Sequence, residues 1–150
     1  MKKKILGLAK KSLDSNNKLI SIDKQIKMMK KDPSSFGYGV IDVDNSLEFA
    51  NIKSQYIYFS HKDIIHINYK HNIDDLELSY VLSRIKDKVV LCMDYVDLYD
   101  PLSKKKSFIL DFNQKIYILR ISKNKLGNIF IDELSTLYYG KNIKNSELKA

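Results

Sequence analysis

Ser107-Phe-Ile-Leu-Asp-Phe-Asn-Gln-Lys-Ile-Tyr-Ile-Leu-Arg-Ile121 contains two apolar runs separated by Asn113-Gln114. A polar dipeptide between two such runs is typical of a hairpin turn, so we expect strands at 106–112 and 115–121. After Ser122 the apolar period lengthens from two to about 3.6 residues. This change predicts an amphipathic helix that ends at Gly140, since glycine often follows a helix C-terminus. The apolar residues of the predicted helix are Leu126, Ile129, Phe130, Leu134, Leu137 and Tyr138.

The residues that precede this stretch also alternate between apolar and polar or run continuously apolar. Turn signals such as Asp44-Asn45 and Asp100-Pro101 separate them, so we expect a series of antiparallel strands. A helix that follows such strands covers an open end or face of their sheet, and the fold class is therefore α+β and mainly β. The further strands are expected near 36–43, 46–52, 55–60, 63–70, 76–84 and 88–99.

The positive charge is concentrated at the N-terminus. The chain has a net charge of +8, and residues 1–31, with ten lysines against two aspartates, account for all of it. We expect a basic helical arm (1–32), a neutral β domain with its closing helix (33–140) and a polar tail (141–150). The candidate residues for binding an anionic partner are Lys2, Lys3, Lys4, Lys10, Lys11, Lys18, Lys24, Lys27, Lys30 and Lys31.

Two short amphipathic helices are predicted in this arm. One apolar stripe lies within 5–13, and a second runs from Leu19 to Met29 at spacings of three and four, before Asp32-Pro33 ends it. The stripes and lysines fit a membrane-surface or nucleic-acid contact. They fit better an arm whose apolar stripes dock on the sheet or on a partner helix, with the lysines in solvent, because the arm lacks the Trp, Phe and Arg of a typical interfacial helix.

Composition indicates a single intracellular domain. The length of 150 residues is enough for one core, and the only cysteine, Cys92, cannot form an internal disulfide, which favours a reducing compartment. The apolar run Ile5–Ala9 is too short for a signal peptide, and no run is long enough for a transmembrane helix. We therefore expect a cytoplasmic protein, and the bias toward Lys, Asn and Ile is typical of an A+T-rich bacterial or phage genome.

No catalytic residue, cofactor site or metal site is predicted. Three histidines spaced by five would alternate between the faces of a continuous strand and would not converge on a metal. Three nearby aspartates are interpreted as a solvated rim, although paired carboxylates can also bind a divalent cation. Gly37-Tyr-Gly39 lacks the spacing of a phosphate-binding loop. The histidines and aspartates are His61, His66, His71, Asp94, Asp97 and Asp100.

Basic and aromatic residues are interspersed between Tyr56 and Lys70, as on a sheet surface that stacks nucleic-acid bases. The alternation also places Tyr56 and Tyr58 on one face, as a sheet core requires. Both interpretations stay open at this point. The residues concerned are Tyr56, Tyr58, Phe59, His61, Lys62, His66, Tyr69 and Lys70.

The run Tyr56-Ile-Tyr-Phe-Ser-His-Lys-Asp-Ile-Ile-His-Ile67 resembles the early segment of bacterial pleckstrin-homology-like (PH-like) domains, in which a strand, a short polar turn and an Asp-Ile-x-x-Ile stretch follow one another. The end of the chain is similar to that family too, with two strands and a closing amphipathic helix that contains Phe130-Ile-Asp-Glu-Leu134. The resemblance covers residues 46–140. It implies an antiparallel, partly open barrel or two-sheet sandwich capped by the C-terminal helix.

The same resemblance implies a binding module rather than an enzyme. Members of the family bind proteins, peptides or lipid head groups, but Lys53, Lys62 and Lys70 are not clustered as a lipid site requires. We therefore expect a non-enzymatic protein–protein interaction domain. The alternatives are nucleic-acid or anionic-membrane binding through residues 1–31, and an enzyme built on Asp94, Asp100 and a histidine.

Overall fold

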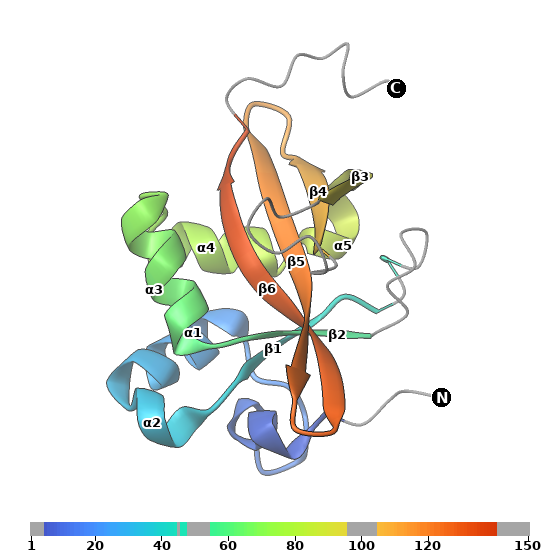
Figure 1. Ribbon diagram of the computed structural model, residues 1–150. Helices are drawn as coiled ribbons and strands as arrows, with labels where there is room; N and C mark the ends of the chain where they lie inside the picture. Colours follow the sequence, from blue (N-terminus) through green and yellow to red (C-terminus); the bar gives the residue numbers. More distant parts are fainter. Residues whose placement is uncertain (1–4, 45, 48–54, 96–104, 141–150) are drawn as a thin grey trace.

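The computed structural model describes residues 5–44, 46–47, 55–95 and 105–140. One six-stranded sheet, in the order β1-β2-β6-β5-β4-β3, forms its centre, and helices pack against that sheet (Figure 1). The strands are β1 (Gly39–Asp42), β2 (Tyr56–Phe59), β3 (Val89–Tyr95), β4 (Lys105–Asp111), β5 (Ile116–Leu126) and β6 (Ile129–Tyr139). The helices are the 3-10 helix η1 (Gly7–Ser12) and α1 (Ile22–Lys31), α2 (Pro33–Phe36), α3 (His61–Lys70), α4 (Asp75–Leu82) and α5 (Ile85–Lys88).

The hairpin predicted at Asn113-Gln114 is confirmed. Strands β4 and β5 pair antiparallel, and the Phe112 N–H donates to the Lys115 carbonyl at 2.9 Å, which closes a two-residue turn. Asn113 has a φ of 71°, a left-handed conformation that asparagine tolerates better than most residues. Strands β1, β2 and β3 also lie within predicted strand segments. The predicted strand at 46–52 lies mostly outside the described residues.

The predicted closing helix is wrong, because residues 129–139 form strand β6. Gly127, with a φ of 61°, allows a tight turn, and β6 pairs antiparallel with β5 over the whole length of the hairpin. The pairing passes from Arg120↔Thr136 to Ile121↔Leu134, so Ser135 is an extra residue in β6. This β-bulge places Leu134 and Leu137 in the same core cluster despite their spacing of three, which gives the strand a helix-like apolar period.

The strands predicted at 63–70 and 76–84 are also wrong, since these segments form α3 and α4. Ser60 is the N-cap of α3 and Asp74 is the N-cap of α4, and each side chain accepts a hydrogen bond from a backbone N–H of the first turn. The buried residues then follow helical spacing, as Ile64 and Ile67 do in α3. Side-chain capping therefore starts helices in segments whose isoleucine and tyrosine content favours strands.

The predicted antiparallel barrel or sandwich is replaced by one open, mixed sheet. Strand β2 pairs antiparallel with β1 but parallel with β6, through Tyr58↔Glu133. The helices α3, α4 and α5 and the strands β3, β4 and β5 all come between β2 and β6 in the chain. The PH-like architecture expected from the resemblance, with its terminal helix, is therefore not what these elements form.

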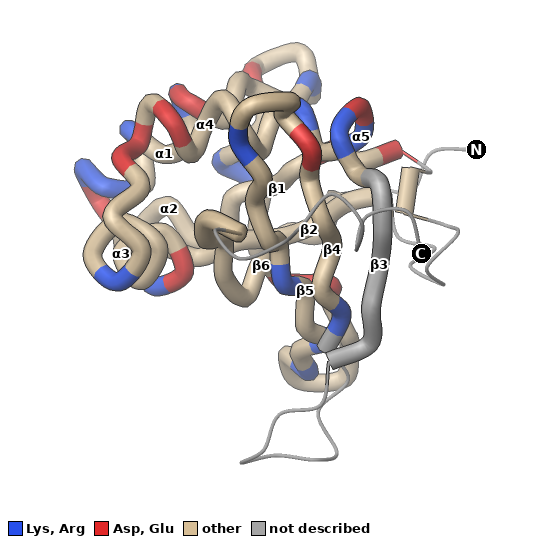
Figure 2. The backbone as a smooth tube through the Cα atoms, turned by 90° about the horizontal axis from the view of Figure 1, so that it is seen from above, with Lys and Arg blue, Asp and Glu red and all other residues tan. Residues whose placement is uncertain are grey.

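Residues 5–31 contribute to two apolar clusters of the domain. Ile22, Ile26 and Met29 of α1 belong to the larger cluster, together with buried residues of the sheet and of α3 and α4. Ala9 of η1 belongs to the smaller cluster, which contains Ile131 of β6. The apolar stripes thus dock on the domain, and Lys and Arg are spread over its helices and strands among the acidic residues (Figure 2).

Gln25 connects α1 to the edge of the sheet through side-chain hydrogen bonds. Its side chain is fully buried, accepts from the Val40 N–H at 2.8 Å and donates to the carbonyls of Val40 and Ile20 at 3.1 and 2.9 Å. Because β1 is an edge strand, its outward amide groups need such a partner when a helix covers them. Gln25 supplies the hydrogen bonds that a neighbouring strand would otherwise make.

Candidate functional site: a carboxyl pocket

A pocket of about 510 Å³ lies where the first turn of α3 meets strands β5 and β6. Its volume is in the range typical of small-molecule sites, and every residue that lines it carries a polar or charged group. Acidic, basic and hydroxyl side chains from four separate parts of the chain meet in it. The lining residues are Tyr38, Ser60, Lys62, Asp63, His66, Arg120, Asn124, Glu133, Ser135 and Thr136.

Helix α3 sets the position of Asp63 through a capping box. The Asp63 N–H donates to Ser60 Oγ at 3.3 Å, and the Asp63 carboxylate accepts from the Ser60 N–H at 2.9 Å. His66 lies three residues after Asp63 and four residues after Lys62. Its side chain is therefore next to both of theirs on one side of the helix. The capping box therefore fixes the helix face that lines the pocket.

Glu133 of β6 faces Asp63. The Asn124 amide on β5 donates to Glu133 Oε1 at 2.9 Å and fixes its orientation, while the Glu133 and Asp63 carboxyl groups are within hydrogen-bonding range of each other. Burial is the main reason that the pKa of Asp63 rises from 3.8 to about 8, and the neighbouring Glu133 raises it further than burial alone would. At neutral pH Asp63 therefore holds a proton that it donates to Glu133.

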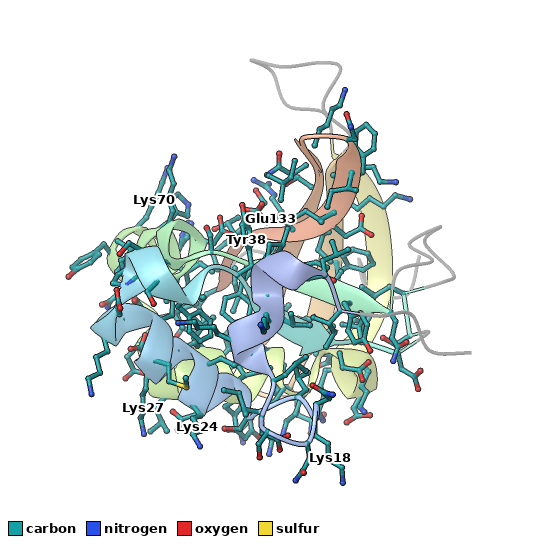
Figure 3. The ribbon with its side chains drawn as sticks, turned by 90° about the horizontal axis from the view of Figure 1, so that it is seen from below. Lys18, Lys24, Lys27, Tyr38, Lys70 and Glu133 are labelled. Carbon is teal, nitrogen blue, oxygen red and sulfur yellow. The ribbon has the colours of Figure 1, made fainter. Side chains whose placement is uncertain are left out.

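Tyr38 adds a hydroxyl group beside this pair (Figure 3). Gly37, with a φ of 82°, turns the chain before it, and the Tyr38 N–H donates to the Leu8 carbonyl at 3.0 Å. Burial raises the pKa of Tyr38, and the nearby Glu133 and Asp63 raise it as well. The Tyr38 hydroxyl therefore keeps its proton and stays a hydrogen-bond donor.

Arg120 of β5 and Thr136 of β6 form the strand side of the pocket and are register partners. Arg120 Nε donates to Ser107 Oγ at 3.3 Å, which holds the guanidinium against the sheet. Thr136 is 8% exposed, and its hydroxyl is buried with no hydrogen-bond partner among the described residues. Buried hydroxyl groups are normally satisfied, so an unpaired one in the wall of a polar pocket is a feature expected of a binding site.

Of the lysines predicted to bind an anionic partner, those that the structure describes do not line this pocket. Lys2, Lys3 and Lys4 lie outside the described residues. Lys18, Lys24 and Lys27 extend away from Tyr38 and Glu133 (Figure 3). Others have acidic or polar partners, as Lys30 does with Asp75 at 2.9 Å and with Asn68 at 2.6 Å. Their role toward an anionic partner stays a prediction. The remaining described lysines of this set are Lys10, Lys11 and Lys31.

The other sequence candidates divide between the pocket and positions outside it. His66 and Lys62 of the basic and aromatic segment line the pocket, whereas Tyr69 is exposed at the far end of α3. The side chains of Cys92 and of Asp94, and all of residues 97 and 100, lie outside what the structure describes. Within the described ranges, no group of three His, Cys, Asp or Glu side chains is arranged to hold a metal ion.

Sequence reasoning missed the carboxyl pair, and only one half of it has a local signal. Ser60 followed by Asp63 is a capping-box pattern, which predicts a helix start and an acidic group in its first turn. Glu133 falls within the predicted C-terminal helix and outside the apolar residues of that helix. Its true position depends on the pairing of β2 with β6, which brings together residues 75 positions apart, and no short pattern predicts such a contact.

Comparison with models of known protein families, with curated proteins and with solved structures gave no match. In the part of the chain that the structure describes, no helix is long and apolar enough to span a membrane.

Proposed function

We propose that the pocket is the active site of an enzyme that cleaves phosphodiester bonds of nucleic acid by general acid–base catalysis. The observation that carries this proposal is the convergence of the Asp63–Glu133 pair with His66 and Arg120 in one open polar pocket. Acid–base catalysis needs a group that holds a proton at the working pH and another that accepts one. An acid with a shifted pKa, beside charged groups in a pocket, is a feature typical of active sites.

The proposed reaction uses each of these groups once. A hydroxyl oxygen attacks phosphorus, and its proton passes to the His66 imidazole at the rim of the pocket. The bond from phosphorus to the leaving oxygen breaks, and that oxygen takes the proton of Asp63. Glu133 keeps Asp63 protonated before the reaction, and Arg120 offsets the negative charge that develops on the phosphate.

Charge supports an anionic substrate. Lys62 and Arg120 line the pocket together with His66, and guanidinium and ammonium groups are the usual protein partners of phosphate. The net charge of +8 favours the approach of a polyanion at low salt. A substrate carrying one negative charge per phosphodiester suits both the local and the overall charge.

The test is a cleavage assay with end-labelled single-stranded RNA, single-stranded DNA and duplex DNA, with and without Mg²⁺. We expect cleavage of at least one of them, and a loss of about 100-fold or more in Glu133→Gln and Asp63→Asn. Asp132→Asn, which changes the neighbouring carboxylate on β6, is the matched control and should keep the wild-type rate. Intact substrates with the wild-type protein, or equal rates for wild type and Glu133→Gln, would overturn the proposal.

A protein-binding role without catalysis, in a cytoplasmic protein, stays the prediction from the sequence. Two exposed apolar side chains favour a protein partner, since Tyr69 on α3 is 82% exposed and Leu76 on α4 is 78% exposed. Affinity capture with the wild-type chain and with a Tyr69→Ser, Leu76→Ser variant tests this role. A partner that both chains retain equally would place the contact elsewhere.

A further inference from the structure

Three aromatic rings and one guanidinium group form a continuous strip beside the carboxyl pocket. The His66 and His71 ring centroids are 5.3 Å apart and meet edge to face, and His71 is in turn 5.3 Å from Tyr138. The Arg120 guanidinium lies 5.2 Å from the centre of the Tyr138 ring. We call these four residues the ring strip. They come from α3, from the residue after it, from β6 and from β5.

The ring strip and the pocket share two residues, His66 and Arg120. Tyr138 is two positions after Thr136 on β6, so both side chains lie on the same face of that strand. A nucleic-acid strand with a phosphate near Arg120 and Thr136 therefore has its neighbouring nucleotide over Tyr138. The His66 ring is exposed, and the rings of His71 and Tyr138 are half-buried, so part of the strip is open to a ligand.

The chemistry of the strip suits a flat, uncharged ring. Burial lowers the pKa of His71, and the neighbouring His66, Lys70 and Arg120 lower it further, so its imidazole is neutral at pH 7. Neutral imidazole and phenol rings and an arginine plane are the surfaces on which unpaired nucleobases stack. A base in a duplex is already stacked and paired, so this surface favours single strands.

We infer that the ring strip is a nucleobase subsite, which holds an unpaired base next to the phosphate in the carboxyl pocket. This inference rests on the proposed function, because it names the part of the nucleic-acid substrate that the strip recognises. Stacking on aromatic side chains tolerates any base, so the subsite selects single-stranded nucleic acid over duplex rather than one sequence over another.

Binding measured separately from cleavage tests the inference. The probe is a short fluorescein-labelled single strand, and its affinity for full-length Glu133→Gln protein is measured by anisotropy. Adding Tyr138→Leu should weaken binding about tenfold. The matched control Tyr69→Leu removes an exposed tyrosine of α3 outside the strip and should change nothing. A second experiment replaces each nucleotide of the probe in turn by an abasic residue. The loss of one base should weaken binding to the protein that keeps Tyr138, and should have little effect on binding to the Tyr138→Leu variant.

The outcomes separate the inference from the proposed function. Equal affinities of the Tyr138 and Tyr138→Leu proteins for the single strand overturn the inference, even where cleavage occurs. No measurable binding of any single strand overturns it too. Binding that depends on Tyr138 without cleavage by the wild-type protein supports the subsite and overturns the catalytic proposal. Circular dichroism and thermal melting of each variant establish that a loss of affinity does not reflect unfolding.

Discussion

The Asp63–Glu133 pair should make the protein less stable at alkaline than at acidic pH, and Glu133→Gln should remove part of that loss. The pKa of Asp63 is 3.8 when unperturbed and about 8 in the fold. At about 1.4 kcal/mol per pH unit, the difference corresponds to at most about 6 kcal/mol. Burial, the largest cause, persists in the variant, so we expect Glu133→Gln to recover about 2 kcal/mol.

The sign follows from proton binding. Between about pH 4 and pH 8 the folded chain keeps a proton on Asp63 that the unfolded chain releases. The stability from this group is therefore full below about pH 4 and is lost as the pH rises through about 8. Glu133→Gln keeps the oxygen that accepts from Asn124 and removes the competing charge. The two proteins should have similar stabilities near pH 4 and diverge toward pH 8.

Thermal melting at both pH values, followed by circular dichroism, measures the effect. For a chain of this length a gain of about 2 kcal/mol corresponds to a rise in Tm of roughly 6 °C at pH 8. Asp132→Asn, on the same strand, is the control and should show no gain that depends on pH. A Glu133→Gln protein that melts at or below the wild-type temperature at pH 8, or that gains equally at both pH values, would refute this account of the pair. A gain in stability with loss of cleavage is the trade-off typical of active-site residues.

Three further substitutions test the fold. Gln25→Met should lower the free energy of unfolding by about 2–4 kcal/mol, because it leaves the buried N–H and carbonyl of Val40 without partners. Denaturant unfolding measures this change, and a loss below about 1 kcal/mol would contradict it. Gly39→Ala should destabilise by at least about 2 kcal/mol, since its Cβ would lie 2.2 Å from the Phe59 ring. Asn113→Gly should raise the Tm slightly or leave it unchanged, because a φ of 71° strains glycine least, and a clear fall in melting temperature would argue against the turn.

The parts of the fold that sequence patterns predicted are those fixed by neighbouring residues. The hairpin at Asn113-Gln114 and the amphipathic helix that ends at Asp32 depend on contacts a few residues apart, and both are present. The failures have local physical causes as well. Capping by Ser60 outweighs the strand propensity of the isoleucines that follow, and the bulge at Ser135 gives β6 an apolar period that is typical of a helix.

The candidate site was predictable only in fragments. Ser60 and Asp63 carry a capping pattern, and His66 and Lys62 were noted as part of a basic and aromatic segment. Nothing near Glu133 in the sequence shows that its carboxyl group meets Asp63, because that contact follows from strand order. A sequence pattern records which residues share a face of one element, whereas this pocket requires the relative position of three elements.

The parallel contact between β2 and β6 explains why the pocket and the ring strip lie side by side. Tyr58 is opposite Glu133, and the chain leaves β2 at Ser60 and enters α3 at once. Because the two strands run in the same direction, α3 advances along β6 from Glu133 toward Tyr138. Asp63 in its first turn therefore meets Glu133, and His71, just after its last turn, meets Tyr138. An antiparallel pairing at the same register would direct α3 toward Ile131 and the hairpin tip, and neither contact would form.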